Sequence, residues 1–291
     1  MQARAYAAPP TLDDALALLA EHGADARVLA GGTDLIIQVR ENRRDVGVMV
    51  DVKAIRELTE FTFLADGSLR IGAATPCARI YRDSQVARRF PAIIDSASLI
   101  GGVQIQSRAS LGGNLCNSSP AADSIPTLIA LGAIAEIRSK RQEREVPVEA
   151  FCTGPGQNVL AADELLVALH IPAPAAHSGA AFQRFIPRNE MDISVTNAAA
   201  NITLSADGQT FTAARIAIGA VAPTPLLVPA AGAALVGQPV GEAAIEAAAA
   251  ASRAAARPIT DMRGSADQRR HLAGVLTARV LRTAIERARA S

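Results

Sequence analysis

The chain has 291 residues, a formal net charge of +1 and 49% apolar residues. This length suits two domains, and this apolar content is enough for a substantial core. The balanced charge argues against nucleic-acid binding, and the sequence contains no apolar run of about 18 residues that would predict a membrane span. Pro9, Pro10 and nearby acidic residues interrupt the N-terminal apolar stretch, so we expect no secretory signal and a cytoplasmic location.

The cysteines and histidines argue against a metal site on this chain. Cys77, Cys116 and Cys152 are widely spaced and form no C-x-x-C pair, so neither a disulfide framework nor a cysteine-ligated zinc or iron–sulfur site is expected. No two histidines form an H-x-x-x-H pair. The sequence also lacks a Ser/His/Asp or Cys/His arrangement, and we therefore predict no catalytic residue on this chain.

The first 55 residues predict a small β–loop–α–β unit after an initial helix. Thr11 precedes the initial helix as an N-cap, and Gly23 ends it. The expected elements are a helix over 12–22, a strand over 26–30, a helix over 33–42 capped by Thr33 or Asp34, and a strand over 46–52.

The next part of the chain mixes helices and strands. The charges of 141–145 alternate in sign, which suits a solvated hairpin. The expected elements are a strand over 68–74, helices over 76–89, 91–101 and 120–131, and strands over 133–139 and 164–172. The Pro-rich stretch 172–179 resembles a linker.

Beyond this linker the pattern changes to strands followed by helices. Strands are expected over 180–185 and within 197–222, with a hairpin turn at Asp207-Gly208. Helices follow over 242–256, which is Ala-rich, and 267–289. The chain is therefore predicted to be an α+β protein, with a two-part N-terminal region of about 175 residues and a C-terminal domain of strands and helices.

Two glycine-containing segments are candidates for ligand binding. The segment VLAGGTDL, Val28–Leu35, places two glycines between a strand and a helix. Such a loop exposes backbone N–H groups at the positive end of a helix and is suited to an anion. The segment is neither G-x-G-x-x-G nor a Walker loop, so taken alone it is more simply interpreted as a tight turn.

The second segment, SLGGN at Ser110–Asn114, has two further glycines. Asn114 and Asn117 offer hydrogen-bonding side chains, and Asp123 stands near a helix start where it could accept a hydrogen bond from a ribose hydroxyl. Two phosphate-sized loops suit a ligand with two phosphates and a sugar. Dinucleotides, NAD and coenzyme A all meet this description.

These segments also carry a family resemblance. VLAGGTDL, SLGGN and NSSPAADSIPTLIAL resemble the flavin-binding subunit of the molybdenum hydroxylases, the medium subunit of the xanthine dehydrogenase and carbon monoxide dehydrogenase type. The resemblance continues through FCTGPGQNVLAADELLVALHIP, RNEMDIS and RPITDMRGSADQRRHLAGVL, so it covers nearly the whole chain.

The resemblance implies a fold and a cofactor. The fold would be a vanillyl-alcohol-oxidase-like (PCMH-type) FAD-binding domain over 1–175, with subdomains of about 1–55 and 56–175. A C-terminal domain of the CO dehydrogenase flavoprotein type would follow over 178–288. FAD would be held without a covalent link, because neither glycine loop has a His or Cys at the place where covalent relatives attach it. The three scattered cysteines do not supply the extra iron–sulfur cluster that one branch of the family carries.

The resemblance also implies the residues that would contact FAD. They are Val28, Leu29, Ala30, Gly31, Gly32, Thr33, Asp34, Leu35, Ile100, Ser110, Leu111, Gly112, Gly113, Asn114, Asn117, Asp123, Leu166, Arg184, Asp192 and Ile193. Arg184 stands where the family commonly has Lys, and Ile100 where it often has an aromatic residue. In similar xanthine dehydrogenases the stretch matching 188–194 lies beside the flavin ring, with Ile at the position of Ile193.

Several of these residues also have plain structural interpretations. Asp123 could be a helix N-cap, Leu166 an ordinary core residue, and Arg184 the partner of a surface acid. Cys116 is interpreted as a small packing residue, and Glu190 as a solvated charge.

The function implied by the resemblance is electron transfer within a multi-subunit hydroxylase. A large subunit would carry molybdopterin, a small subunit two [2Fe-2S] clusters, and this chain FAD that passes electrons to NAD⁺ or another acceptor. The assembly would be a dimer of heterotrimers. A stand-alone flavin oxidoreductase and a flavin-free assembly subunit of the same fold are the alternatives.

Overall fold

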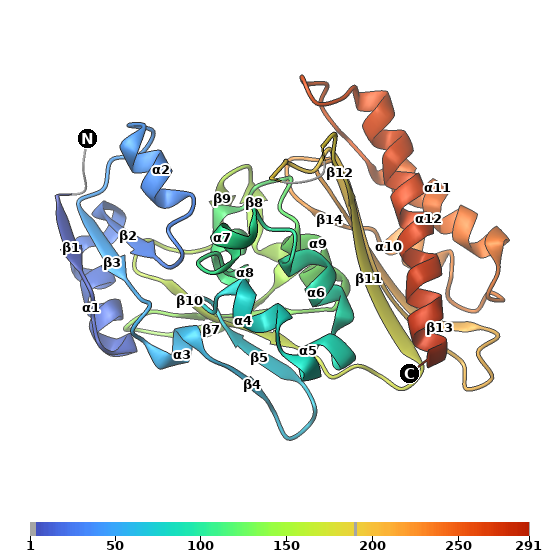
Figure 1. The fold of residues 1–291 in the computed structure, drawn as a ribbon, viewed down its shortest axis with the longest axis horizontal. Helices are drawn as coiled ribbons and strands as arrows, with labels where there is room; N and C mark the ends of the chain where they lie inside the picture. The colour runs from blue at the N-terminus through green and yellow to red at the C-terminus, as the bar shows by residue number, and fades with distance from the viewer. Residues whose placement is uncertain (1–3, 189–190, 291) are drawn as a thin grey trace.

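The computed structural model describes residues 4–188 and 191–290. Three parts follow one another along the long axis of the molecule, each built around its own sheet (Figure 1). They contain three, five and four strands, and a two-stranded hairpin of β8 (Cys152–Gly154) and β9 (Gln157–Asn158) is added to the middle part.

The first part confirms the predicted β–loop–α–β unit. The strands β1 (Ala5–Ala7), β3 (Val48–Asp51) and β2 (Ala26–Leu29) form a parallel sheet in that order. The helix α1 (Leu12–His22) begins where the Thr11 hydroxyl accepts a hydrogen bond from the Asp14 N–H, as predicted. The short helix α2 (Leu35–Arg40) follows β2. The sequence analysis did not predict β1, which is only three residues long and mostly exposed.

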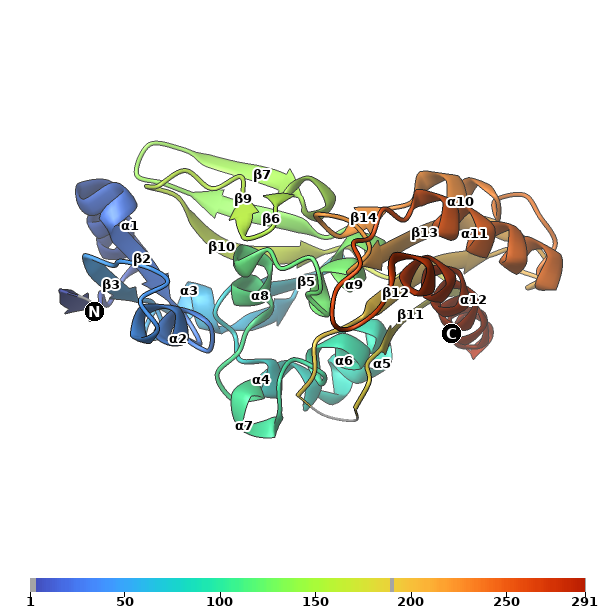
Figure 2. The same ribbon diagram turned by 90° about the horizontal axis from the view of Figure 1, so that it is seen from above.

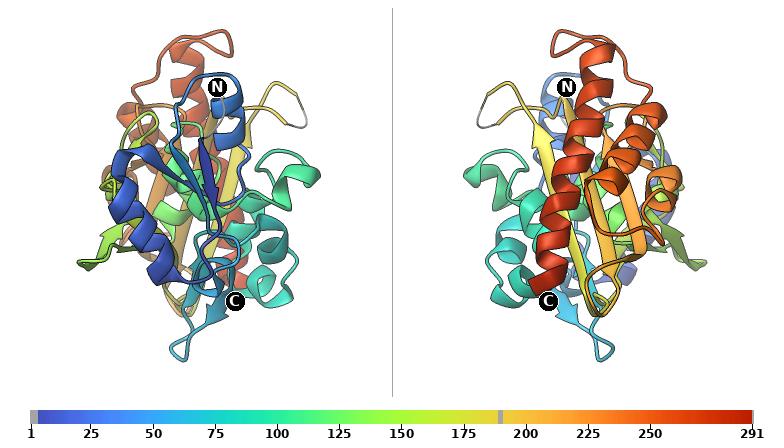
Figure 3. Two further views of the ribbon diagram at one scale, coloured as in Figure 1. Left: turned by 90° about the vertical axis from the view of Figure 1, so that its left-hand side faces the viewer. Right: turned by 90° about the vertical axis from the view of Figure 1, so that its right-hand side faces the viewer.

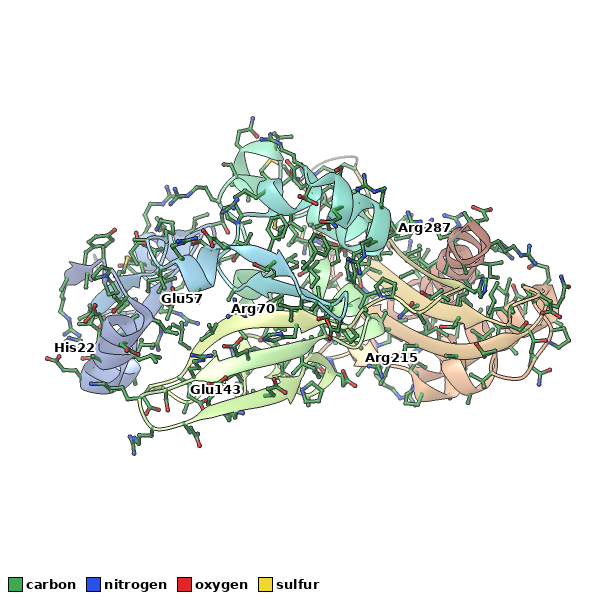
Figure 4. The ribbon with its side chains drawn as sticks, turned by 90° about the horizontal axis from the view of Figure 1, so that it is seen from below. His22, Glu57, Arg70, Glu143, Arg215 and Arg287 are labelled. Atoms are coloured by element: carbon green, nitrogen blue, oxygen red, sulfur yellow. The ribbon has the colours of Figure 1, made fainter. Side chains whose placement is uncertain are left out.

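The middle part is an antiparallel sheet with helices gathered on one side (Figure 2). The strand order is β4 (Phe61–Phe63), β5 (Leu69–Gly72), β10 (Leu165–Ile171), β6 (Ile134–Arg138) and β7 (Glu143–Pro147). The helices are α3 (Arg56–Thr59), α4 (Cys77–Tyr81), α5 (Ser84–Arg89), α6 (Pro91–Ala97), α7 (Val103–Gln106), α8 (Leu111–Asn117) and α9 (Ser124–Ala130). Figure 4 labels Arg70 and Glu143 on two strands of this sheet.

Two predictions for the middle part were wrong. The helix expected over 76–89 is two helices, because the Asp83 carboxylate accepts hydrogen bonds from the N–H groups of Gln85 and Val86 and starts α5. The second glycine segment is not a loop. The Ser110 hydroxyl accepts a hydrogen bond from the Gly113 N–H and caps α8, so both glycines of that segment lie in the first turn of a helix.

The third part is an antiparallel sheet of β11 (Ser178–Phe185), β12 (Thr196–Leu204), β13 (Phe211–Gly219) and β14 (Leu226–Leu227). The helices α10 (Pro229–Ala233), α11 (Glu242–Ala255) and α12 (Ala266–Ala290) complete it, and α12 lies along β11 and β12 (Figure 3, right). The predicted hairpin turn at Asp207-Gly208 and both long C-terminal helices are confirmed.

The third sheet is buried on both faces, which joins it to the rest of the molecule. Phe182, Ala199 and Ala217 belong to the large apolar core of the first two parts, and α9 packs on β12 and β13. Alternate residues of the same strands, such as Ala198 and Ile218, pack into a second core beneath α11 and α12. Small alanines on both faces of β12 allow this close packing.

Candidate cofactor-binding site

A cavity of about 330 Å³ lies between the first and middle parts of the molecule. Its volume falls within the range of small-molecule sites. One wall comes from the end of β2, the start of α2 and the loop after α2, and the other from α8, the β8–β9 hairpin and the start of β10.

Most of the residues predicted to bind a cofactor line this cavity. They are Val28, Ala30, Gly31, Gly32, Thr33, Asp34, Leu35, Ile100, Ser110, Gly112, Gly113, Asn114, Asn117 and Leu166. The two glycine segments, about 80 residues apart in the sequence, are therefore parts of one site.

Close backbone packing explains two of the glycines. A Cβ atom added to Gly31 would lie 2.2 Å from the carbonyl oxygen of Arg108, two residues before Ser110. A Cβ atom added to Gly112 would lie 2.4 Å from the carbonyl oxygen of Ala73. Only glycine allows these approaches, so both residues hold the walls of the cavity together.

The first glycine segment presents free hydrogen-bond donors to the cavity. Within the described part of the chain, no group accepts a hydrogen bond from the backbone N–H of Gly31, Gly32, Thr33 or Asp34. Gly32 has a φ of 75°, which turns the backbone before α2 begins. Successive free N–H groups beside a left-handed residue form a concave anion site, here called the N–H cradle.

Leu29 and Leu111, two of the predicted contacts, are buried in the apolar core instead of lining the cavity. Leu29 lies two residues before Gly31, and Leu111 lies directly before Gly112. Their side chains therefore contribute packing at these positions.

Asp123 and Arg184 also lie outside the cavity lining and form a buried ion pair between the middle and third parts. Their closest N–O distance is 2.6 Å, and the Ser194 hydroxyl donates a further hydrogen bond to Asp123 at 2.6 Å. Arg184 also donates to the carbonyl oxygen of Leu99, next to the cavity residue Ile100. Asp123 precedes α9 but makes no capping hydrogen bond, so the N-cap interpretation is wrong.

Asp192 and Ile193 lie in the connection between β11 and β12, outside the cavity lining. Ile193 is 50% exposed and its neighbour Met191 is 58% exposed, so the structure leaves an apolar surface there. The Asp192 carboxylate lies 3.5 Å from the guanidinium of Arg188 and accepts a hydrogen bond from the Ile193 N–H. Glu190 lies outside the described residues.

The sequence analysis missed several polar residues of the cavity. They are Arg27, Gln38, Arg44, Asn158 and Glu164. The Asn158 side chain donates a hydrogen bond to the carbonyl oxygen of Cys116, which attaches the β8–β9 hairpin to α8. Asn158 and Glu164 lie in the segment FCTGPGQNVLAADELLVALHIP that carries the family resemblance, but neither was singled out as a contact residue.

Two further groups that line the cavity have pKa values that keep them in a single protonation state at neutral pH. Cys116 lines the cavity, but burial raises the pKa of its thiol to about 12, so it is not a thiolate at neutral pH. Glu164 forms a bidentate pair with Arg144, both distances being 2.7 Å, and this guanidinium lowers the pKa of the carboxyl to about 2.

Across residues 4–188 and 191–290 no cluster of three or more His, Cys, Asp or Glu could hold a metal, and no helix could span a membrane.

Two family models match the chain in succession. The FAD binding domain in molybdopterin dehydrogenase matches residues 1–174, and the CO dehydrogenase flavoprotein C-terminal domain matches residues 181–284. The chain belongs to the FAD-binding subunits of the molybdenum hydroxylases. This result confirms the resemblance of the sequence motifs and the predicted fold class.

Individual relatives agree with this family. This chain is 38% identical over 281 residues to the xanthine dehydrogenase FAD-binding subunit of Escherichia coli O157:H7. The alignment covers 96% of this chain and 95% of the relative. Its structure is similar to carbon monoxide dehydrogenase from Hydrogenophaga pseudoflava lacking the Mo-pyranopterin moiety, with a TM-score of 0.93, 32% identity and 98% of each chain covered. Quinoline 2-oxidoreductase from Pseudomonas putida 86 gives a TM-score of 0.90 at 31% identity, again covering 98% of each chain.

The cavity fits the cofactor of this family. FAD needs an anion site for its diphosphate, which the N–H cradle can supply, and polar and apolar surfaces on either side of it. Ser110, Asn114 and Asn117 provide the polar groups, and Ile100 and Leu166 the apolar ones.

Proposed function

We propose that this FAD-binding subunit is the electron-exit subunit of a molybdopterin-dependent hydroxylase. FAD, when bound, supplies redox chemistry that takes electrons from [2Fe-2S] clusters of a small partner subunit and delivers them to NAD⁺ or another acceptor. A large partner subunit would hold the molybdopterin, and the assembly would be a dimer of heterotrimers in the cytoplasm.

The convergence of the two glycine segments on one cavity supports this proposal most directly. The N–H cradle at Gly31–Asp34 would hold the FAD diphosphate, and the capped start of α8 would contact it from the other wall. Both helix starts are positively polarised, which favours an anion between them.

The remaining predicted contacts would act around the flavin half of the cofactor. Ile100 lines the cavity, and its neighbour Leu99 accepts a hydrogen bond from Arg184, which in turn pairs with Asp123. We propose that the Asp123–Arg184 pair, which lies between the middle and third parts, positions the part of the cavity wall that contains Ile100. The exposed side chain of Ile193 would be covered by the flavin ring, with Asp192 setting the charge near it.

The proposal is tested first by the cofactor content of the purified chain. We expect one FAD per chain, released by acid precipitation because no covalent link forms. A chain that stays colourless after incubation with FAD would contradict the proposal and favour an assembly subunit without flavin.

The second test separates electron transfer from substrate oxidation. We expect no flavin reduction when candidate organic substrates are added to the isolated chain, because the sequence predicts no catalytic residue and no cluster among the described residues could hold a metal. Flavin reduction by substrate should appear once the molybdenum and iron–sulfur subunits are added, as measured by the loss of flavin absorbance under anaerobic conditions. Substrate-dependent reduction by the chain alone would show a stand-alone oxidoreductase.

A further inference from the structure

The cavity has a cationic region at the wall formed by the first part of the molecule. Arg27 comes from β2, Gln38 from α2 and Arg44 from the loop after α2, and all three line the cavity. Gln38 lies three residues after Leu35, the first residue of α2, so it stands about one helical turn beyond the N–H cradle.

Arg27 has an unused donor in this region. Its Nη1 donates to the carbonyl oxygens of Ala24 and Ala26, at 2.7 and 2.6 Å, which fixes the guanidinium against the chain. Its Nε is buried and has no hydrogen-bond partner in the structure. Among the described residues, none accepts a hydrogen bond from its Nη2, so this nitrogen is the donor of Arg27 that is left for a ligand.

Arg44 is unpaired as well. Among the described residues, none forms an ion pair or hydrogen bond with its guanidinium, whereas the preceding Arg43 lies 2.9 Å from Glu41. Arg27 and Arg44 line the same cavity, and burial and the charge of Arg44 both lower the pKa of Arg27. Two neighbouring like charges facing one cavity favour an anionic or electron-rich ligand between them.

The position of this region relates it to one half of the cofactor. If the N–H cradle holds the diphosphate and Ile100 lies beside the flavin half, the region beyond the cradle is left for the AMP half. Arginine suits this half in two ways, since guanidinium groups pair with phosphate and stack on aromatic bases. The chain has no tryptophan and 3% aromatic residues, so cations rather than aromatic rings are available for such stacking.

We propose that Arg27 and Arg44 bind the AMP half of FAD and thereby give the subunit its preference for FAD over FMN. This inference rests on the proposed function, because it requires FAD in the cavity. It predicts that the two arginines contribute to the affinity for FAD and AMP and make no contribution to the affinity for FMN, which lacks the AMP half.

The test compares FAD and FMN binding to the full apo chain. Dissociation constants are measured by flavin fluorescence for the wild type, Arg44→Ala, Arg27→Gln and the control Arg43→Ala. Arg43 has the same charge and lies in the same loop, but it does not line the cavity. We expect Arg44→Ala and Arg27→Gln to weaken FAD binding about tenfold and leave FMN binding unchanged, and Arg43→Ala to change neither.

Competition by AMP and by adenosine identifies the group that is recognised. AMP should displace FAD from the wild type about tenfold more effectively than from Arg44→Ala. If adenosine shows the same difference, the base and ribose are bound, and if only AMP shows it, the phosphate is bound. Either result supports the proposal, and equal competition in both proteins contradicts it.

Other outcomes separate the two proposals. If the wild type binds neither FAD nor FMN, the proposed function itself fails. If FAD binds the wild type, Arg44→Ala and Arg43→Ala equally, or if Arg44→Ala weakens FAD and FMN equally, the assignment of the arginines is overturned. Arg27→Gln could disturb folding through its bonds to the chain, so the exposed Arg44 decides the test, with the apo unfolding temperature as a check.

Discussion

Gly156 and Gly208 form a matched pair of glycines for testing the cavity. Their φ angles are 70° and 68°, and a Cβ atom added to either would meet nothing within 4 Å. Gly156 lines the cavity, whereas Gly208 lies in the hairpin between β12 and β13. The backbone strain of a new side chain is therefore similar at the two sites.

We expect Gly156→Asp to weaken FAD binding tenfold or more, roughly the effect of one like charge near a phosphate at a partly screened site. Gly208→Asp should leave FAD binding unchanged. It should lower the unfolding temperature by about as much as Gly156→Asp does. Flavin fluorescence titration and thermal unfolding of both variants check this. Equal loss of FAD from both variants would mean that folding rather than recognition is affected.

Individual residues of the cavity were predicted where they belong to a contiguous motif and missed where they do not. Gly31–Leu35 was found because glycines before a helix are visible in the sequence. Arg27 and Arg44 were missed because a single arginine in a strand or loop carries no local signal, and only the parallel pairing of β2 with β3 brings their stretches together.

At the scale of single elements, the capped start of α8 is the feature most closely tied to the cofactor. The Ser110 hydroxyl accepts a hydrogen bond from the Gly113 N–H at 3.0 Å, and the Thr11 hydroxyl caps α1 in the same way. We expect Ser110→Ala and Thr11→Ala each to reduce the free energy of unfolding by about 1 kcal/mol. Only Ser110→Ala should also weaken FAD binding, because α1 does not line the cavity.

Urea unfolding of the apo chain and FAD titration check this pair of variants. Unchanged FAD affinity in Ser110→Ala would show that the order of the first turn of α8 is not needed for binding. If Thr11→Ala lost as much FAD as Ser110→Ala, the loss would reflect reduced stability rather than the cap of α8.

The Glu164–Arg144 pair connects the start of β10 to β7. The Arg144 guanidinium holds the pKa of Glu164 at about 2, below its ordinary value of 4.5. Because the folded pKa is the lower one, this pair stabilises the fold fully above pH 4.5, and its contribution is lost as the pH falls toward 2. Glu164→Gln should therefore flatten the pH dependence of stability in this window and cost about 1–3 kcal/mol at pH 7.

Urea unfolding from pH 2 to pH 7 measures this effect. Glu143 is a suitable control because it lies on β7 and forms an exposed pair with Arg138. Glu143→Gln should change the free energy of unfolding by less than about 0.5 kcal/mol. A Glu164→Gln variant with the wild-type pH dependence would contradict the assignment.

The elements themselves show why sequence patterns succeed and fail. Most long helices and strands were predicted because their caps and apolar periodicity are local. The helix α8 was interpreted as a loop because glycine disfavours helices, although Gly112 is needed where α8 meets the backbone of Ala73. The three-residue β1 exists through pairing with β3, some 40 residues later, and has no local pattern of its own.

At the scale of the whole molecule, one ion pair joins three elements at the interface of the middle and third parts. The Asp95 carboxylate of α6 pairs with Arg287 of α12, at 2.6 and 3.0 Å, and accepts a hydrogen bond from the Phe182 N–H of β11. Arg287, which is labelled in Figure 4, also donates to the carbonyl oxygen of Ala180. Residues about 190 apart in the sequence are thus held together at the interface of the two parts.

We expect Arg287→Met to lower the free energy of unfolding by about 1.5–3 kcal/mol, because it leaves a partly buried carboxylate without its cation. Arg282 offers a control on the same helix, since it pairs with Glu242 on the exposed surface of the third part. Arg282→Met should change the stability by less than about 1 kcal/mol. FAD affinity should be retained in both variants, because neither arginine lines the cavity.

Calorimetry of the full chain with and without FAD distinguishes the possible consequences. If the Asp95–Arg287 pair couples the parts, Arg287→Met should broaden or split the thermal transition, with the third part unfolding first and FAD stabilising only the later transition. Arg287→Met could instead give a single, sharp transition, with an unfolding temperature lowered as little as in Arg282→Met. That result would show that the shared apolar core of α9, β12 and β13 joins the parts without help from this pair.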